Sequence, residues 1–92
     1  MNEEKKQYTL IPTPKFLKQM KKLDKFTRQQ IRGYMEKVVA DYGEPWSKGK
    51  GLSANHAGEW RYRVGDYRVI VEIQENNLVV LALEVGHRRK VY

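Results

Sequence analysis

The segment GEWRYRVGDYRVIVEI, which spans residues 58–73, contains three arginines whose spacing suits the binding of an anion. Arg61 and Arg63 are one residue apart, and Arg68 follows a Gly-Asp pair that is typical of a two-residue β-hairpin turn. Side chains alternate between the faces of a strand, so Arg61 and Arg63 share a face, and the turn brings Arg68 alongside. Guanidinium groups bind phosphate oxygens through paired hydrogen bonds. The spacing predicts an arginine surface for an anion; a solvated face neutralised by glutamates is the alternative.

A second group of cationic and titratable side chains follows in the segment GHRRKVY. His87, Arg88, Arg89 and Lys90 come directly after an apolar stretch, and Tyr92 is close behind them. Histidine and tyrosine can transfer protons, whereas arginine keeps its proton in proteins. These residues therefore predict phosphate chemistry at the open end of a sheet, and a basic tail without such a role is the alternative.

Two lysines, Lys48 and Lys50, flank Gly49 in the glycine-rich segment 43–59, which is predicted to be a loop. Glycines beside a lysine allow the backbone to approach a phosphate closely. The segment does not match the phosphate-loop pattern, which requires a Gly-Lys-Ser/Thr run after a strand. The two lysines are therefore candidates for RNA binding, or they belong to a solvated loop.

The pattern around these groups predicts a single α+β domain covering residues 1–92. Thr13 followed by Pro14 is a favoured helix start, and Asp24 can cap a second helix. Apolar residues at helical spacing predict a helical hairpin that packs on one face of an antiparallel β-meander. We expect a strand over 8–13, helices over 14–22 and 24–42, and strands over 60–64, 67–74 and 78–85, with Gly86 ending the last strand.

Alternation within the predicted elements also indicates the core. The helices should contribute one apolar stripe each, and the arginine strands should contribute the side chains opposite the arginines. The last strand is apolar on both faces, which indicates an interior position in the sheet. The expected core-facing residues are Phe16, Leu17, Met20, Leu23, Ile31, Tyr34, Met35, Val38, Val39, Tyr42, Trp60, Tyr62, Val64, Tyr67, Val69, Val71 and Ile73.

The composition limits the environment and the partners. The chain has a formal net charge of +7, which favours a polyanionic partner such as nucleic acid, an acidic membrane surface or an acidic protein. Cysteine is absent, there is no apolar run long enough to span a membrane, and the first residues lack a signal-peptide pattern. We therefore expect a cytoplasmic protein without a membrane span.

The sequence offers few routes to catalysis. The two histidines, His56 and His87, are not at metal-ligand spacing, and there is no acidic cluster like that of a magnesium-dependent nuclease. Ser47 and Ser53 lack the companions of a nucleophilic serine. We expect no metal and no cofactor. The chemistry that remains is cleavage of RNA in which the substrate's own 2′-hydroxyl attacks the adjacent phosphorus.

Over nearly its whole length, the chain resembles the RelE toxins of the RelE/ParE superfamily. The resemblance rests on the order of a strand, a helical hairpin and a meander, on GEWRYRVGDYRVIVEI, and on LVVLALEVGHRRKVY. It implies a small toxin of a type II toxin–antitoxin pair that enters the ribosomal A site and cuts messenger RNA there. It also implies two partners, the ribosome with its messenger RNA and a RelB-like antitoxin that neutralises the toxin.

The resemblance assigns roles to individual residues. The paired basic positions of the family fall on Arg61 and Arg63, and the other matching positions are Arg68, Arg88 and Tyr92. It implies that the arginines of the hairpin orient the scissile phosphate and that Tyr92 helps to deprotonate the 2′-hydroxyl. Arg88 or His87 would then assist the leaving 5′-oxygen, with Arg89, Lys90, Lys48 and Lys50 as further RNA contacts.

Two other functions remain compatible with the sequence. A ParE-type toxin shares the fold but acts on DNA gyrase, and its members typically lack the combination of Arg68, Arg88 and Tyr92. A non-catalytic RNA- or protein-binding module would use the same basic surface without cutting. Supercoiling by gyrase and the appearance of cut RNA ends discriminate between the three.

Overall fold

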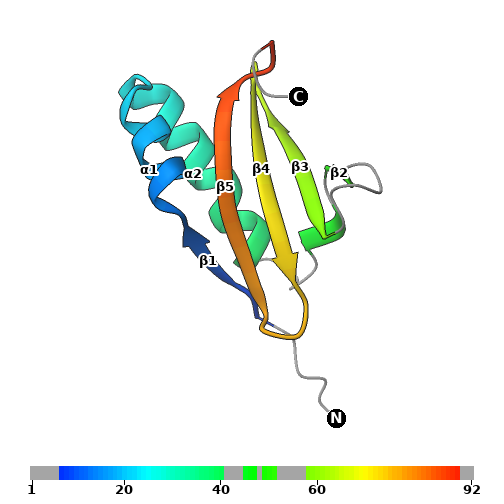
Figure 1. Cartoon of the computed structure of the whole chain (residues 1–92). Helices are drawn as coiled ribbons and strands as arrows, with labels where there is room; N and C mark the ends of the chain where they lie inside the picture. The colour runs from blue at the N-terminus through cyan, green and yellow to red at the C-terminus, as the bar shows by residue number, and fades with distance from the viewer. Residues whose placement is uncertain (1–6, 41–44, 48, 52–57, 90–92) are drawn as a thin grey trace.

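The computed structural model describes residues 7–40, 45–47, 49–51 and 58–89, which form a sheet with two helices packed on one of its faces (Figure 1). The strands lie in the order β1-β5-β4-β3-β2, with β1 parallel to β5 and the other neighbours antiparallel. In chain order the elements are β1 (Thr9–Pro12), α1 (Pro14–Lys21), α2 (Lys25–Ala40), the 3₁₀ turn η1 (Pro45–Ser47), β2 (Lys50–Gly51), β3 (Glu59–Val64), β4 (Tyr67–Gln74) and β5 (Val79–His87).

The predicted α+β architecture is confirmed, including the helical hairpin and the meander, and β4 has the predicted bounds. Two features of the segment 43–59 were missed, because η1 and β2 are too short to produce a periodic pattern. The prediction that Gly86 ends the last strand was wrong. Strand β5 continues to His87, and the Arg88 N–H still donates to the Asp66 carbonyl oxygen at 2.8 Å.

The core lies between the helices and one face of the sheet. It contains the predicted side chains of β3 and β4, with Tyr62, Val69 and Val71 fully buried, and those of β5 that share their face. Ile31 and Met35 of α2 are each 1% exposed and pack against this face. Burial of these side chains fixes which face of β3 and β4 is left for other uses.

Among the described helical residues predicted to be in the core, Leu17 is the one for which the prediction was wrong, since its side chain is 49% exposed; the predicted core residue Tyr42 lies outside the described residues. The neighbouring positions Phe16 and Met20 lie one turn apart and are buried. A helix advances by about 100° per residue, so the side chain after Phe16 points along the rim of the buried stripe.

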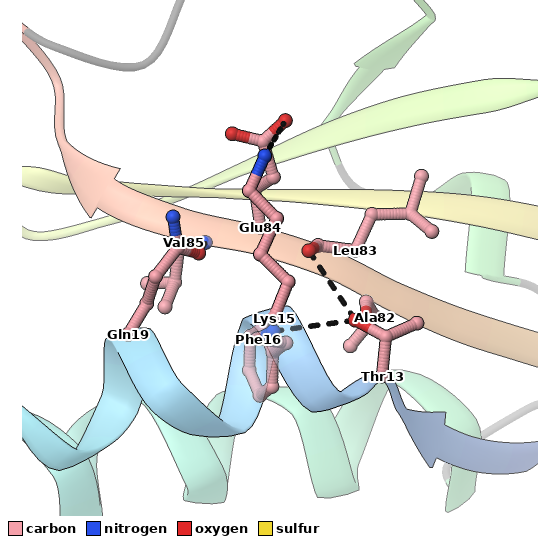
Figure 2. Close-up of polar contacts among 8 residues, drawn as sticks. All are labelled: Thr13, Lys15, Phe16, Gln19, Ala82, Leu83, Glu84 and Val85. Carbon is pink, nitrogen blue, oxygen red and sulfur yellow. Dashed lines mark hydrogen bonds and ion pairs between the residues drawn. The ribbon is translucent and has the colours of Figure 1, made fainter.

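Helix α1 is attached to the edge of β5 through its first residues and a glutamine (Figure 2). Strand β1 pairs with β5 as far as Ala82, and Thr13 then donates from both its N–H and its hydroxyl to the Ala82 carbonyl oxygen, at 3.0 and 2.8 Å. The same hydroxyl accepts from Phe16 N at 3.2 Å, which confirms Thr13 as the N-cap. One turn later the Gln19 side-chain oxygen accepts from Val85 N at 2.8 Å. Side chains of α1 thus replace β1 as partners of β5, which protects an otherwise open edge.

Asp24 caps α2 as predicted. Its carboxylate accepts hydrogen bonds from the Thr27 hydroxyl at 2.6 Å and from Thr27 N at 3.3 Å. The hydrogen bond from the Thr27 side chain lowers the pKa of Asp24 below its ordinary value of 3.8. None of the helices in the described ranges has the length and apolar character that crossing a membrane requires.

The Asp24 cap predicts a pH dependence of stability. A carboxyl whose pKa is lower in the folded state stabilises the fold above its unfolded pKa, and this contribution is lost as the pH falls through the folded value. Asp24→Asn keeps a good N-cap without the charge. We expect the wild type to melt at a higher temperature than Asp24→Asn at neutral pH, with the difference disappearing below pH 3.8 in thermal denaturation followed by circular dichroism. A difference independent of pH would contradict this role of the charge.

Candidate functional site

Two of the predicted arginines face each other across β3 and β4. The register pairs Arg63 with Arg68 and Arg61 with Ile70, while the alternate residues Tyr62 and Val64 are buried on the helical side. Directly paired residues of an antiparallel ladder project from the same face. Arg61, Arg63 and Arg68 therefore share one face, as predicted, and we call the face of the sheet that carries them the arginine face.

The centre of the arginine face is apolar, which the sequence analysis did not anticipate. Ile70 is 2% exposed although it lies opposite the helices. Its neighbours in the ladder are Arg61 on β3 and Glu84 on β5, whose methylene groups can cover it. The register shifts at Ile70, so that Leu83 is an extra residue of β5. Figure 2 shows Leu83 and Glu84 both extending away from α1, as expected on the two positions of a β-bulge.

Charge is distributed unevenly along the arginine face. At one end Glu59 of β3 is paired with Glu72 of β4, and at the other end Arg63 is paired with Arg68. The residue opposite Arg68 on β5 is Gly86, which adds no side chain to this face. The basic end is thus the part of this face at which an anion is most strongly attracted.

Strand β2 adds Lys50 to the arginine face, in the row of Arg61 and Ile70. Lys50 pairs with Arg61, so both side chains project from the arginine face. Gly51 packs on the ring of Trp60, and a Cβ added to Gly51 would lie 3.0–3.3 Å from the nearest ring atoms. Gly49 has a φ of +79°, and a Cβ there would collide with the backbone oxygen of Arg61 and lie 2.8 Å from the Tyr62 ring. The glycines beside Lys50 therefore serve the close approach of β2 to β3.

The chain before β2 is anchored by a buried tyrosine of β3. The Tyr62 hydroxyl donates to the Pro45 carbonyl oxygen at 2.6 Å, and its ring contacts that of Tyr34. In addition, Trp46 meets Tyr8 edge to face at 5.9 Å between ring centroids. Burial, with a smaller contribution from Tyr34, raises the pKa of Tyr62 well above its ordinary value, so this phenol is a structural donor.

His87 is the last residue of β5, and Arg88 lies in the turn that follows it. His87 is paired with Tyr67 on the helical side, and the two rings meet at 5.6 Å between centroids. Its Nδ1 accepts from Arg89 N at 3.3 Å, which places the ring proton on Nε2 when the imidazole is neutral. The N–H of Arg88 donates to the Asp66 carbonyl oxygen of the turn between β3 and β4. The structure thus holds the backbone of Arg88 at the same end of the sheet as Arg63 and Arg68, whereas the His87 side chain faces the helical side.

Four further predicted site residues are not assigned to either face of the sheet. Tyr92, Lys90 and Lys48 lie outside the described residues, and Arg89 is exposed at the end of the described chain. Over 7–40, 45–47, 49–51 and 58–89, the structure contains no group of three histidine, aspartate or glutamate side chains able to hold a metal ion.

Comparison with known protein families shows which family the chain belongs to. Residues 10–92 match the sequence profile described as the ParE toxin of the type II toxin-antitoxin system, parDE. The chain belongs to the RelE/ParE superfamily of type II toxins. No curated protein sequence matches this toxin significantly.

Solved structures of toxin–antitoxin systems share the fold of this toxin. A chain of the RelBE2 complex from Mycobacterium tuberculosis has 27% identity and a TM-score of 0.74, and the match covers 95% of this chain and 98% of that chain. The isolated E. coli RelE toxin has 21% identity and a TM-score of 0.68, and the match covers 87% of this chain and 83% of that chain. A chain of the archaeal RelE-RelB complex from Pyrococcus horikoshii OT3 has 19% identity and a TM-score of 0.70, and the match covers 92% of this chain and 99% of that chain.

The close approach at Gly49 leads to a stability prediction. We expect Gly49→Ala to lower the free energy of unfolding by about 1–3 kcal/mol, because a Cβ meets backbone and the φ of +79° is strained for alanine. Gly58→Ala is the matched control, since Gly58 also has a positive φ, +83°, but no atom lies within 4 Å of its added Cβ. Urea denaturation of both variants measures the difference. Equal losses would show that the steric contact with β3 is unimportant.

Proposed function

We propose that this toxin is a ribosome-dependent endoribonuclease that cuts messenger RNA in the ribosomal A site without a metal ion. Two observations support the proposal: the chain belongs to the toxin superfamily, and the arginine face has side chains of a type that binds phosphate groups. Fold alone does not specify an activity, so the argument depends on the site.

The direct pairing of Arg63 with Arg68 is the observation that carries the proposal. Like charges placed directly opposite each other in a sheet are unfavourable, and the cost falls when an anion lies between them. Arg61 and Lys50, which are paired with each other, extend the positive charge along β3 and β2. A phosphodiester is an anion that paired guanidinium groups bind in a fixed orientation.

Each step of the proposed reaction requires a defined group. The 2′-hydroxyl oxygen forms a bond to phosphorus as the bond from phosphorus to the 5′-oxygen breaks, which leaves a 2′,3′-cyclic phosphate and a 5′-hydroxyl. Arg61, Arg63 and Arg68 orient the phosphate and stabilise the charge that develops on its oxygens. Arg88 stabilises the negative charge on the departing 5′-oxygen, which takes its proton from water because the guanidinium keeps its own. Tyr92 remains the predicted acceptor of the 2′-hydroxyl proton, although it lies outside the described residues.

The remaining basic residues are assigned to binding. Lys50 is held beside Arg61, and we propose that it contacts a neighbouring phosphate, together with Arg89 and with Lys48 and Lys90 from outside the described ranges. Because His87 faces the helical side and its Nδ1 accepts from the backbone, we assign the leaving-group step to Arg88 alone.

We propose an antitoxin as the protein partner. Homologues have been crystallised with RelB antitoxins, including those from Mycobacterium tuberculosis and E. coli. A net charge of +7 favours an acidic segment that covers the arginine face in the cytoplasm until the antitoxin is removed.

Inhibition of DNA gyrase is the second candidate function, because the matching sequence profile carries the name of the ParE toxin. It would use the same fold without RNA cleavage. A non-catalytic binding module is the third. Supercoiling of relaxed plasmid by gyrase in the presence of purified toxin tests the second candidate directly.

Primer extension on a messenger RNA translated in a purified system tests the proposed activity. We expect the toxin to produce cuts within codons only when ribosomes are present. Arg68→Ala should slow single-turnover cleavage about a hundredfold, as expected when a group that stabilises the transition state is lost. Arg32→Ala is the matched control, because Arg32 is an exposed arginine of α2, and its cleavage rate should equal that of the wild type.

The possible results separate the candidates. Cuts without ribosomes would indicate a free ribonuclease that uses the same chemistry. Intact RNA together with inhibited supercoiling would establish the gyrase function in place of ours. Intact RNA, unchanged supercoiling and retained RNA binding by folded protein would leave a binding module.

A further inference from the structure

An ion pair links α1 to the arginine face. Lys15 Nζ lies 3.5 Å from Glu84 Oε2, with the lysine side chain 63% exposed and the glutamate side chain 29% exposed. Figure 2 shows Lys15 extending from the first turn of α1 across β5 to reach the carboxylate. The two residues are far apart in sequence, and no local pattern predicts their contact.

Glu84 occupies a sensitive position on the arginine face. It is paired with Ile70, which lies between it and Arg61 in the ladder. Arg68 is paired with Gly86, so Glu84 is its diagonal neighbour, at a Cβ separation of about 7–8 Å. Long side chains interact over this distance. A carboxylate here therefore competes with a bound anion for the same positive charge.

We propose that Lys15 is a positioning residue that holds the Glu84 carboxylate and offsets its charge, so that the arginine face keeps its affinity for phosphate groups. The identity of the anion as RNA rests on the proposed function, whereas the charge balance does not. Lys15 acts through Glu84 and need not touch the anion.

The attachment of α1 makes this arrangement specific. Thr13 and Gln19 bind the backbone of β5 at Ala82 and Val85, on either side of Glu84. Lys15 lies between these two anchors on α1, so its ammonium group is delivered to Glu84 by a rigid element (Figure 2). Lys18 also lies between the two anchors in the sequence, but the ammonium group that reaches Glu84 is that of Lys15.

The ion pair itself contributes little to folding. Exposed ion pairs typically stabilise a protein by at most about 1 kcal/mol, so removal of Lys15 should leave the melting temperature almost unchanged. An unbalanced charge on this diagonal neighbour of Arg68, at an effective dielectric constant between that of the protein surface and that of water, changes the affinity for an anion by about fivefold. Function, not stability, is therefore the property expected to respond.

A double-mutant cycle with two anion probes tests the proposal. Inorganic pyrophosphate reports on the arginine face alone, and a short single-stranded RNA in which the 2′-hydroxyls are methylated reports on RNA binding without cleavage. Dissociation constants are measured at low salt by calorimetry or by NMR titration of the backbone amides. The proteins are the wild type, Lys15→Met, Glu84→Gln and the double variant, with Lys37→Met of α2 as a control for net charge.

For pyrophosphate we expect Lys15→Met to weaken binding about fivefold and Glu84→Gln to bind about as tightly as the wild type, because Lys15 already offsets the Glu84 charge and acts only through it. The double variant should recover wild-type affinity, because the unbalanced carboxylate is gone. Lys37→Met should change affinity much less than Lys15→Met. Rescue by Glu84→Gln is the decisive result, since a lysine that contacted the anion directly would not be rescued.

Other outcomes overturn the proposal or limit its setting. Additive effects of the two substitutions, or no pyrophosphate binding by the wild type, would overturn it. Slower RNA cleavage by Glu84→Gln at unchanged RNA affinity would also overturn it, because Glu84 would then take part in the reaction. If pyrophosphate shows the rescue and primer extension with ribosomes shows no RNA cleavage, the charge balance stands and the proposed function fails.

Discussion

The two-faced character of β3 and β4 is the constraint on which the rest of the structure depends. Every second side chain of these strands is buried under the helices, so the intervening side chains must project from the opposite face. A slip of one residue would exchange the two sets and place the arginines in the core. Burial of Tyr62, Val69 and Val71 therefore keeps Arg63 and Arg68 in register, even though their mutual repulsion opposes that pairing.

The electrostatics of the arginine face follow from the same register. Glu59 is paired with Glu72 at one end and Arg63 with Arg68 at the other, so the face is acidic at one end and basic at the other. The apolar Ile70 separates the two ends. Glu84 is the carboxylate that interrupts this order near the basic end, and α1 supplies Lys15 to offset it. The helices thus have two roles, because they cover the core and also tune the exposed face of the sheet.

The superfamily relationship limits the function without choosing it. The chain matches the ParE sequence profile over residues 10–92, while its fold superposes on RelE toxins and their complexes. Two toxins with this fold and different targets would differ mainly in the side chains of the exposed face. The paired arginines and the lysine beside Arg61, Lys50, are therefore the features that favour an RNA phosphate as the ligand.

The sequence by itself determined the order and type of the main elements, because periodicity, the caps at Thr13 and Asp24 and the Gly65-Asp66 turn are local signals. It also determined the shared face of Arg61, Arg63 and Arg68, since alternation and one tight turn suffice for that inference. The pairing of β2 with β3, the parallel contact of β1 with β5 and the side of the sheet taken by His87 were decided only by the tertiary structure. So was the contact of Lys15 with Glu84. These features depend on contacts between distant segments, which carry no signature in either segment alone.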